Sequence, residues 1–254
     1  MLSTRYYVPE PLPQNDRNNH MQGTIKSKDV TERRDVDIEY LVDRLLNFHE
    51  RHQGPSRIIV TVAGVPGSGK STVTKKVCDE LNKKLGAAFV VVLPQDGFHY
   101  YRKELMNTAD PEESMRRRGA PFTFNNEKLL AMVQRVKFRG NSTILAPDFS
   151  HQLKDPTENS IIITPQTRIV LVEGNYVHLN ADSWKEISAL ADDKWTVLAD
   201  LDMIKERLIK RHVEAGICAN EKESEARVEK NDLVNAKYII DHSVSPNIVI
   251  MNLT

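Results

Sequence analysis

The sequence lacks any run of about eighteen apolar residues, the length that a helix needs to span a membrane. It lacks an excess of either charge, because 35 basic residues balance 35 acidic residues, and this balance argues against a broad basic surface for nucleic acid or anionic lipid. Its two cysteines, Cys78 and Cys218, have no metal-type spacing and indicate reduced thiols. We therefore expect a cytoplasmic protein without a membrane or nucleic-acid partner.

The N-terminal region lacks the apolar core of a secretory signal. Residues 1–34 are polar, contain Pro9, Pro11 and Pro13, and show no sustained periodicity, which predicts a disordered or loosely packed tail. A mitochondrial presequence stays open, although the amphipathic Arg/Ser pattern of such a segment is poor here. Residues 35–254 are enough for one α/β domain with a large core.

What the sequence does contain is a glycine-rich loop, GVPGSGKS at 64–71, which fits the pattern G-x-x-x-x-G-K-[ST]. An apolar, β-branched run at 57–63 precedes it, and residues at helical spacing follow it, so a strand and a helix flank the loop. This context favours a nucleotide phosphate site over a glycine turn without a ligand. The residues expected to bind the nucleotide are Gly64, Val65, Pro66, Gly67, Ser68, Gly69, Lys70, Ser71 and Thr72.

The periodicity of the rest of the chain predicts alternating strands and helices. An amphipathic helix is expected at 35–53, and further helices at 127–138, 181–191 and 203–215. Besides 57–63, buried strands are expected at 89–93, 168–172, 195–199 and 248–251, and shorter strands at 143–146 and 161–164 form a peripheral β-hairpin. The fold expected is an α/β P-loop three-layer sandwich with a mainly parallel five-stranded sheet and a helical lid.

Acidic residues follow three of the expected strands: Asp96, Glu173, and the pair Asp200 and Asp202. The carboxyl ends of parallel strands share one edge of the sheet, so these carboxylates are expected near Lys70 and Ser71. For Asp200 and Asp202 a simple helix cap is the favoured interpretation. For Asp96 a functional role is favoured, because Gly97 follows and no regular helix starts at once.

Five segments, in their order along the chain, look like the phosphoribulokinase, uridine kinase and pantothenate kinase family; they read GVPGSGKST, QDGFHYYR, RRGAPFTFN, PDFSHQLKDP and VEGNY. The resemblance covers residues 36–254. It implies an ATP- and Mg²⁺-dependent kinase in which Asp96 is the base toward an acceptor hydroxyl. It further implies that Glu173 polarises the Mg²⁺ shell together with Ser71, and that Arg207 and Arg211 of a lid helix join Lys70 at the phosphates.

The acceptor site is less well defined by the sequence. PDFSH matches the acceptor-contacting segment of the family loosely, and Arg116–Arg118 either bind an acceptor anion or solubilise a short helix. Asn231, Asp232 and Asn235 either border the nucleotide or belong to a capped surface helix, and the lid arginines also fit an ordinary surface run. The substrate candidates are His99, Tyr100, Arg117, Asp148 and His151.

Among P-loop proteins, a GTPase is disfavoured because the nearest string to N-K-x-D, at 82–85, ends in leucine, and no LSGGQ-like segment indicates an ABC ATPase. We expect a kinase that transfers the γ-phosphoryl group of ATP to a hydroxyl of a nucleoside, a pantothenate-like compound or a sugar. The alternative is a nucleotide-binding regulatory or assembly protein without a small-molecule acceptor. Both a monomer and a homodimer remain open.

Overall fold

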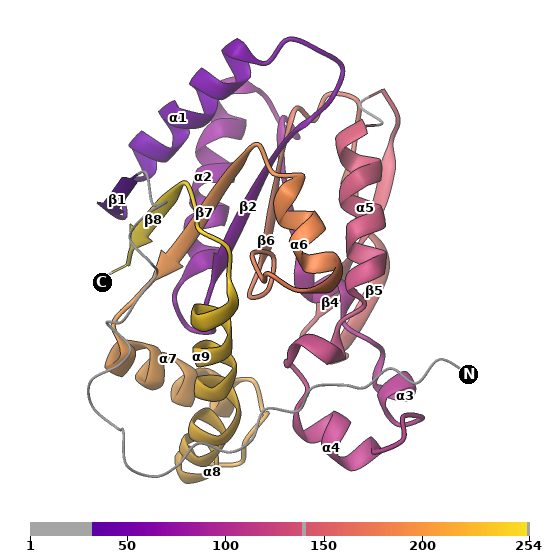
Figure 1. The fold of residues 1–254 in the computed structure, drawn as a ribbon, viewed down its shortest axis with the longest axis vertical. Coiled ribbons are helices and arrows are strands. Elements are labelled where there is room, and N and C mark those ends of the chain that lie inside the picture. Colours follow the sequence, from indigo (N-terminus) through magenta and orange to yellow (C-terminus); the bar gives the residue numbers. More distant parts are fainter. Residues whose placement is uncertain (1–31, 139–140, 253–254) are drawn as a thin grey trace.

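The computed structural model describes residues 32–138 and 141–252 (Figure 1). The elements in chain order are β1 (Glu32–Asp35), α1 (Ile38–Arg51), β2 (Ile58–Gly64), α2 (Lys70–Leu85), β3 (Val90–Pro94), η1 (Gln95–Phe98), α3 (Arg102–Leu105), α4 (Pro111–Arg116), η2 (Pro121–Thr123), α5 (Asn126–Phe138), β4 (Ile144–Ser150), β5 (Asp155–Ile163), β6 (Ile169–Gly174), α6 (Asp182–Ala189), β7 (Asp193–Leu198), α7 (Leu201–Glu214), α8 (Glu221–Arg227), the π-helical η3 (Val228–Asp232), α9 (Leu233–His242) and β8 (Ile248–Met251).

The main sheet is parallel and has the strand order β1-β8-β7-β2-β6-β3. Its central strands β2 and β6 are buried along their whole length, as continuous apolar runs predict for strands covered on both faces. The α/β class, the parallel sheet and the hairpin are confirmed. The described residues give the sheet six strands instead of five, because the polar segment ERRD of β1 pairs with β8 at the edge.

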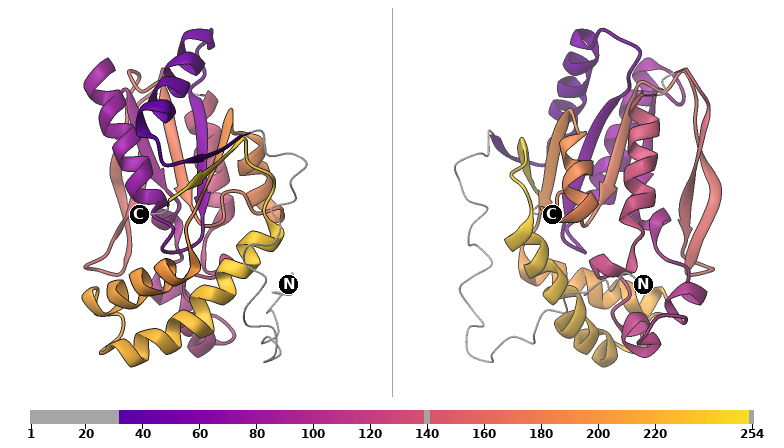
Figure 2. Two further views of the ribbon diagram at one scale, coloured as in Figure 1. Left: turned by 90° about the vertical axis from the view of Figure 1, so that its left-hand side faces the viewer. Right: turned by 45° about the vertical axis from the view of Figure 1, so that its right-hand side comes forward.

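Helices cover both faces of the sheet, which produces the three predicted layers (Figures 1 and 2). Helices α1 and α2 pack on one face, where Ile58, Val60 and Val62 of β2 point. Helices α5 and α6 pack on the other face with Ile59 and Ala63 of the same strand. This alternation along β2 follows from the two-residue repeat of a strand and divides the core into two clusters.

Helix α1 shows how local sequence sets the element boundaries. The Asp37 carboxylate accepts a hydrogen bond of 2.9 Å from the Tyr40 N–H, so the helix begins after Asp37 and not at residue 35. The domain boundary predicted at residue 35 lies at the end of β1, so the sheet extends to residue 32. The rest of the predicted tail, residues 1–31, lies outside the described residues.

Two appendages flank the sheet. The antiparallel hairpin of β4 and β5 pairs Ile144 with Ile163 and Asp148 with Thr157, and is longer than predicted. We define the lid as α7, α8, η3 and α9, which lie beyond the carboxyl ends of the strands (Figure 1). Within the described residues, none of the helices combines the length and apolarity that crossing a bilayer requires.

Candidate active site

The P-loop joins β2 to α2 and points toward the lid (Figure 1). Gly67 and Gly69 have φ angles of 80° and 87°, the left-handed region that favours glycine. A Cβ atom at position 69 would lie 2.1 Å from Asn252 Nδ2, which donates a hydrogen bond of 2.8 Å to the Ser68 carbonyl. A backbone curled in this way can turn N–H groups toward a phosphate. Residues 64–72 thus lie in the strand–loop–helix context that the motif requires.

Glu173 connects the P-loop to the neighbouring strand. It lies at the carboxyl end of β6, directly beside Val62 of β2. Its Oε1 atom accepts a hydrogen bond of 3.1 Å from Ser71 Oγ and lies 3.8 Å from Lys70 Nζ. Burial raises the pKa of Glu173, while the positive charge of Lys70 lowers it. The three predicted residues therefore form one cluster at the mouth of the P-loop, with Glu173 buried, Lys70 half-buried and Ser71 exposed.

The oxygens of Ser71 and Glu173 fit a Mg²⁺ ion that is also bound by nucleotide phosphates and water. Mg²⁺ prefers hard oxygen ligands and is commonly held by one or two protein groups plus substrate phosphates. In the described part of the chain, no group of three or more His, Cys, Asp or Glu side chains could hold a metal, at this site or elsewhere. A metal bound here would depend on the nucleotide for most of its ligands.

Asp96 lies in η1, immediately after β3, on the far side of β6 from the P-loop strand. Its side chain is 54% exposed, and its charge contributes to the raised pKa of Glu173, so the two carboxylates lie within electrostatic range of each other. His99 Nε2 lies 3.9 Å from Asp96 Oδ1, and the His99 ring stacks on Phe124 at 3.8 Å. Burial lowers the pKa of His99 to about 4, so this imidazole is neutral at pH 7.

Two amide side chains with buried polar atoms, those of Gln95 and Asn175, were not predicted to belong to this site. Gln95 Oε1 accepts a hydrogen bond of 2.9 Å from the Tyr176 N–H, and a Cβ at Gly174 would lie 2.2 Å from the same oxygen. Gln95 Nε2 and Asn175 Oδ1 are buried without a hydrogen-bond partner. The sequence signal that could have identified them is their position beside the predicted site residues, since Gln95 precedes Asp96 and Asn175 follows Glu173 by two residues.

The hairpin brings other candidates toward Asp96. A Cβ at Gly97 would lie 2.4 Å from the Pro147 carbonyl oxygen, so glycine permits β4 to approach η1. The Phe149 ring lies 5.3 Å from His99 and 5.4 Å from His151. Asp148 is exposed and accepts a hydrogen bond from the Phe149 N–H. The structure therefore places Asp148 and His151 on the outer part of the hairpin, where the Phe149 ring contacts both His151 and His99.

The three arginines of the segment RRRGA, at 116–120, have different partners. Arg116 forms a surface ion pair with Glu113. Arg117 is 6% exposed and donates a hydrogen bond of 3.3 Å to Asn235 Oδ1 of α9. Arg118 donates to Asp155 Oδ1 at 2.9 Å and to the Tyr100 carbonyl, and its charge interacts with that of Asp96. Tyr100 thus contributes its carbonyl oxygen to this side of the site.

The lid helix α7 approaches the P-loop through one of its two predicted arginines. Arg207 Nη1 donates a hydrogen bond of 3.2 Å to the Gly67 carbonyl. Arg211 lies one turn further along and is exposed, and its charge acts on Asp232 instead. Asp200 accepts hydrogen bonds from the Asp202 and Met203 N–H groups, so its predicted role as a helix cap is confirmed.

The lid segment with Asn231, Asp232 and Asn235 is not a surface helix, because these side chains are buried. Burial raises the pKa of Asp232 to about 6, against the lowering effect of Arg227 and Arg211. His212 Nε2 lies 3.7 Å from Asp232 Oδ2, but burial lowers the pKa of His212 to about 4. This contact is therefore no ion pair at pH 7.

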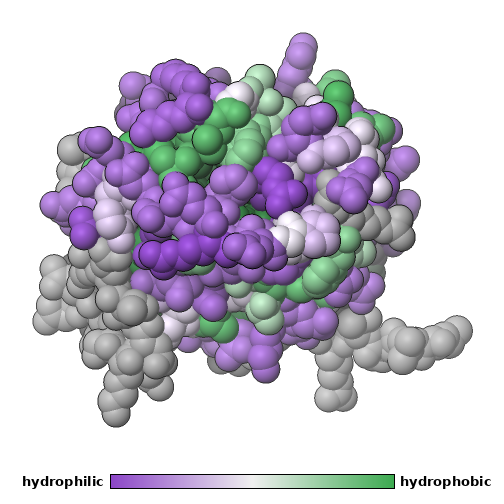
Figure 3. Space-filling view, turned by 90° about the horizontal axis from the view of Figure 1, so that it is seen from above, coloured by the Kyte–Doolittle hydropathy of each residue, from purple (hydrophilic) through white to green (hydrophobic). Residues whose placement is uncertain are grey.

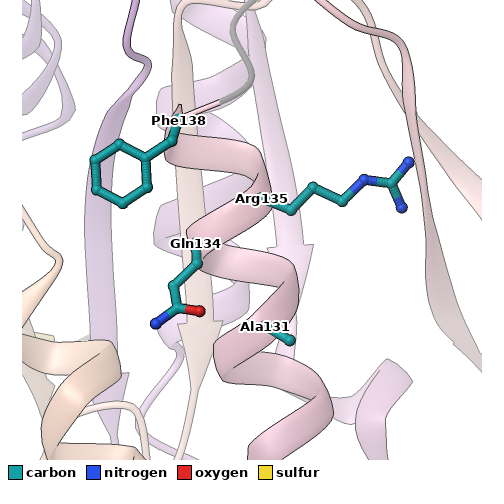
Figure 4. A pocket seen from close by; sticks show the side chains of 4 residues that line it. All are labelled: Ala131, Gln134, Arg135 and Phe138. Carbon is teal, nitrogen blue, oxygen red and sulfur yellow. The ribbon is translucent and has the colours of Figure 1, made fainter.

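A hollow on α5 lies far from these groups and is lined by Ala131, Gln134, Arg135 and Phe138 (Figure 4). The backbone carbonyl of Lys137 in this helix accepts a hydrogen bond from the backbone N–H of Arg57, which precedes β2. The hollow therefore lies toward the amino ends of the strands. Figure 3 views the molecule from this end, where hydrophilic side chains surround a smaller apolar area. The hollow contains no carboxylate, imidazole or thiol for catalysis.

Comparison with known proteins places the chain among kinases, although no family model matches it. It is 34% identical over 203 residues to "Putative uridine kinase C227.14" of Schizosaccharomyces pombe, covering 80% of this chain and 86% of that protein. It is 38% identical over 148 residues to the ATP-dependent kinase-like protein notR' of Aspergillus versicolor, covering 57% and 86%.

The fold is shared with the crystal structure of YFH7 from Saccharomyces cerevisiae, with a TM-score of 0.78 and 23% identity. That match covers 86% of this chain and 100% of the other. The P-loop, the buried Glu173 and the exposed Asp96 lie at one edge of the sheet, and the relatives with this degree of similarity are named as kinases. The chain therefore belongs to the phosphoribulokinase and uridine kinase family of ATP-dependent P-loop kinases.

Proposed function

We propose that this protein transfers the γ-phosphoryl group of Mg·ATP to a hydroxyl group of a small metabolite. The observation that carries the proposal is the convergence of two different carboxylates at the P-loop edge of the sheet. Glu173 is buried against Lys70 and Ser71, whereas Asp96, on the neighbouring strand, is open to a second reactant. A protein that only binds or hydrolyses nucleotide has no need for the second, exposed carboxylate with its own aromatic surroundings.

Phosphoryl transfer requires positioning and neutralisation of charge on the phosphate oxygens. In this proposal the P-loop N–H groups and Lys70 bind the β- and γ-phosphates. Arg207, already at the Gly67 carbonyl, adds positive charge from the lid, and Arg211 comes closer when the lid moves. Mg²⁺ held by Ser71 and Glu173 would add further charge neutralisation when it is bound.

Asp96 is the proposed general base. Its carboxylate takes the proton of the acceptor hydroxyl as that oxygen bonds to phosphorus, so the hydroxyl must lie within hydrogen-bond distance of it. The neutral imidazole of His99 lies beside Asp96 and can orient the same hydroxyl without competing as a cation. His99, Tyr100, Asp148 and His151 then border the acceptor, which is a nucleoside, a pantothenate-like compound or a sugar.

A coupled assay of ADP release tests this proposal across nucleosides, pantothenate, sugars and sugar phosphates. We expect at least one acceptor to stimulate ADP release by the wild type, and Asp96→Asn to lower that rate by about 10²–10⁴-fold. Asp79→Asn is the matched control, because the Asp79 carboxylate is exposed on α2 and forms a surface ion pair with Lys75. Tight ATP binding without stimulation by any acceptor would contradict the kinase proposal and favour a regulatory nucleotide-binding protein.

A further inference from the structure

Between the lid and the 117–119 segment lies a set of polar side chains that we call the polar layer: Arg117, Arg227, Asn231, Asp232 and Asn235. Arg117, Asn231, Asp232 and Asn235 are 3–8% exposed, which is unusual for charged and amide side chains. Asn231 and Asp232 lie on the π-helical η3, a kind of irregularity that is frequent at functional sites. None of these residues belongs to the P-loop at 64–72.

The polar layer is incompletely hydrogen-bonded. Two donors, Arg117 Nε and Arg227 Nε, and two acceptors, Asn231 Oδ1 and Asp232 Oδ2, are buried without a hydrogen-bond partner. Leaving such groups unpaired is costly, and most buried polar groups in proteins avoid it. Their concentration in one layer therefore indicates a missing partner and not merely a structural role.

The polar layer is adjacent to the proposed acceptor site. The Tyr176 hydroxyl donates a hydrogen bond of 2.6 Å to the Gly119 carbonyl, which fixes the fully buried phenol beneath the 117–119 segment. The charges of Arg117, Asp232 and Asp96 all affect the pKa of this phenol, so the three side chains lie within electrostatic range of one ring. A small molecule with a hydroxyl at Asp96 can therefore extend toward the polar layer.

The chemistry of the unpaired atoms indicates the class of ligand. A carboxylate or phosphate would pair the two arginine donors, but it would face Asp232 and leave both acceptor oxygens unpaired. A hydroxyl group both donates and accepts, so neighbouring hydroxyls can satisfy all four atoms. We propose that the polar layer binds a neutral, polyhydroxylated part of the phosphoryl acceptor, such as a sugar or ribose ring. This inference rests on the proposed kinase function.

Binding at this place requires the lid to move, because the unpaired atoms are closed off from solvent. The contacts that hold the lid here are weak. Arg117 donates to Asn235 at 3.3 Å, Arg227 donates to the Arg118 carbonyl at 3.4 Å, and Lys154 Nζ donates to the Gly216 carbonyl at 3.1 Å. An acceptor that replaces these contacts with several hydrogen bonds would favour closure of the lid around itself.

Steady-state kinetics of Asn231→Leu and Asp232→Asn test the inference. The panel holds neutral polyols (uridine, D-fructose and D-ribose) and charged acceptors (pantothenate, D-glycerate and ribulose 5-phosphate). We expect a neutral polyol to stimulate ADP release and each variant to raise its KM about tenfold, the loss of about one hydrogen bond, with the KM for ATP unchanged. Asn220→Ala is the control, because Asn220 caps α8 on the exposed side of the lid.

A measurement of thermal unfolding separates binding from a structural role. Asn231→Leu removes an unpaired buried acceptor at nearly constant volume, so its unfolding temperature is expected to equal or exceed that of the wild type. A lower unfolding temperature would assign Asn231 a structural role and overturn the inference. So would stimulation by charged acceptors alone, or unchanged KM values for the polyol, and both results leave the kinase proposal intact. Failure of every acceptor with the wild type contradicts both proposals.

Discussion

At the scale of single residues, the site depends on two carboxylates that the fold treats differently. Glu173 is buried beside Lys70 and Ser71, where a cation bound with the nucleotide would offset the hydration that the carboxylate has lost. Asp96 has more than half of its side chain exposed, as suits a group that must meet an incoming reactant. Carboxylates at two neighbouring strand ends therefore lie in different surroundings, which fits the two roles proposed for them.

Glu173→Gln should separate metal binding from stability. Because burial raises the pKa of Glu173, its ionised form destabilises the fold at pH values above that pKa, and glutamine removes this cost. We expect the metal-free variant to be at least as stable as the wild type in urea unfolding at pH 8, and the Mg²⁺ concentration for half-maximal activity to rise. An unchanged Mg²⁺ dependence would show that Glu173 has no part in metal binding.

The sequence could place the P-loop, Asp96 and Glu173 at one edge of the sheet, because each lies at or just after the end of an apolar strand. It could not separate Arg116, Arg117 and Arg118, since successive residues of a helical turn point in different directions and only the packed fold decides their partners. The burial of Asn231 and Asp232 could not be predicted either, because polar residues at helical spacing give the same sequence pattern on an exposed surface and in a buried interface.

At the scale of elements, the strands of the main sheet that were predicted are those with apolar, β-branched sequences. β1 was not predicted, because an edge strand can be short and polar, and its sequence here is ERRD. Its position in the sheet is set by parallel pairing with β8. The hairpin was predicted too short for a related reason. Its outer half, at 147–160, is largely exposed and carries no apolar alternation.

Arg57 connects elements at the end of the sheet opposite the P-loop. The fully buried guanidinium donates to the carbonyls of four residues, Val136, Ser142, Thr164 and Thr167. Arg57→Met leaves these carbonyls without that donor, so we expect a loss of about 3–5 kcal/mol in the free energy of unfolding. Arg168→Met, at a more exposed arginine, should cost less than about 1 kcal/mol. Equal effects of the two variants in urea unfolding would contradict this account.

At the scale of the whole molecule, the lid contacts both the P-loop and the 117–119 segment. Arg207 reaches the P-loop, while Arg117 and Arg227 connect the 117–119 segment with α8 and α9. The core below is continuous with the lid through Ile204, Leu208 and Ala236. The lid is therefore anchored by apolar packing and joined to the 117–119 segment by long hydrogen bonds.

Acid should destabilise the whole fold at pH values where most carboxylates are still ionised. Burial lowers the pKa of His99 to about 4 and that of His178 to about 3, so the unfolded chain binds protons first as the pH falls below about 6.5. Each histidine then costs up to about 1.4 kcal/mol per pH unit, and the raised pKa of Asp232 opposes this in part below pH 6. We expect lower stability at pH 5 than at pH 7, with a smaller difference in His99→Phe. Equal urea midpoints at both pH values would contradict the burial of these imidazoles.

The central claim is that the γ-phosphoryl group moves from ATP to an acceptor hydroxyl through the action of Asp96. The most direct measurement follows radiolabel from [γ-³²P]ATP into the product, with the acceptor found by the ADP-release assay, for the wild type and Asp96→Asn. The account predicts labelled acceptor from the wild type, at least about 10²-fold less from the variant, and similar ATP affinity for both. Label that appears only in inorganic phosphate, or equal transfer by both proteins, would contradict it.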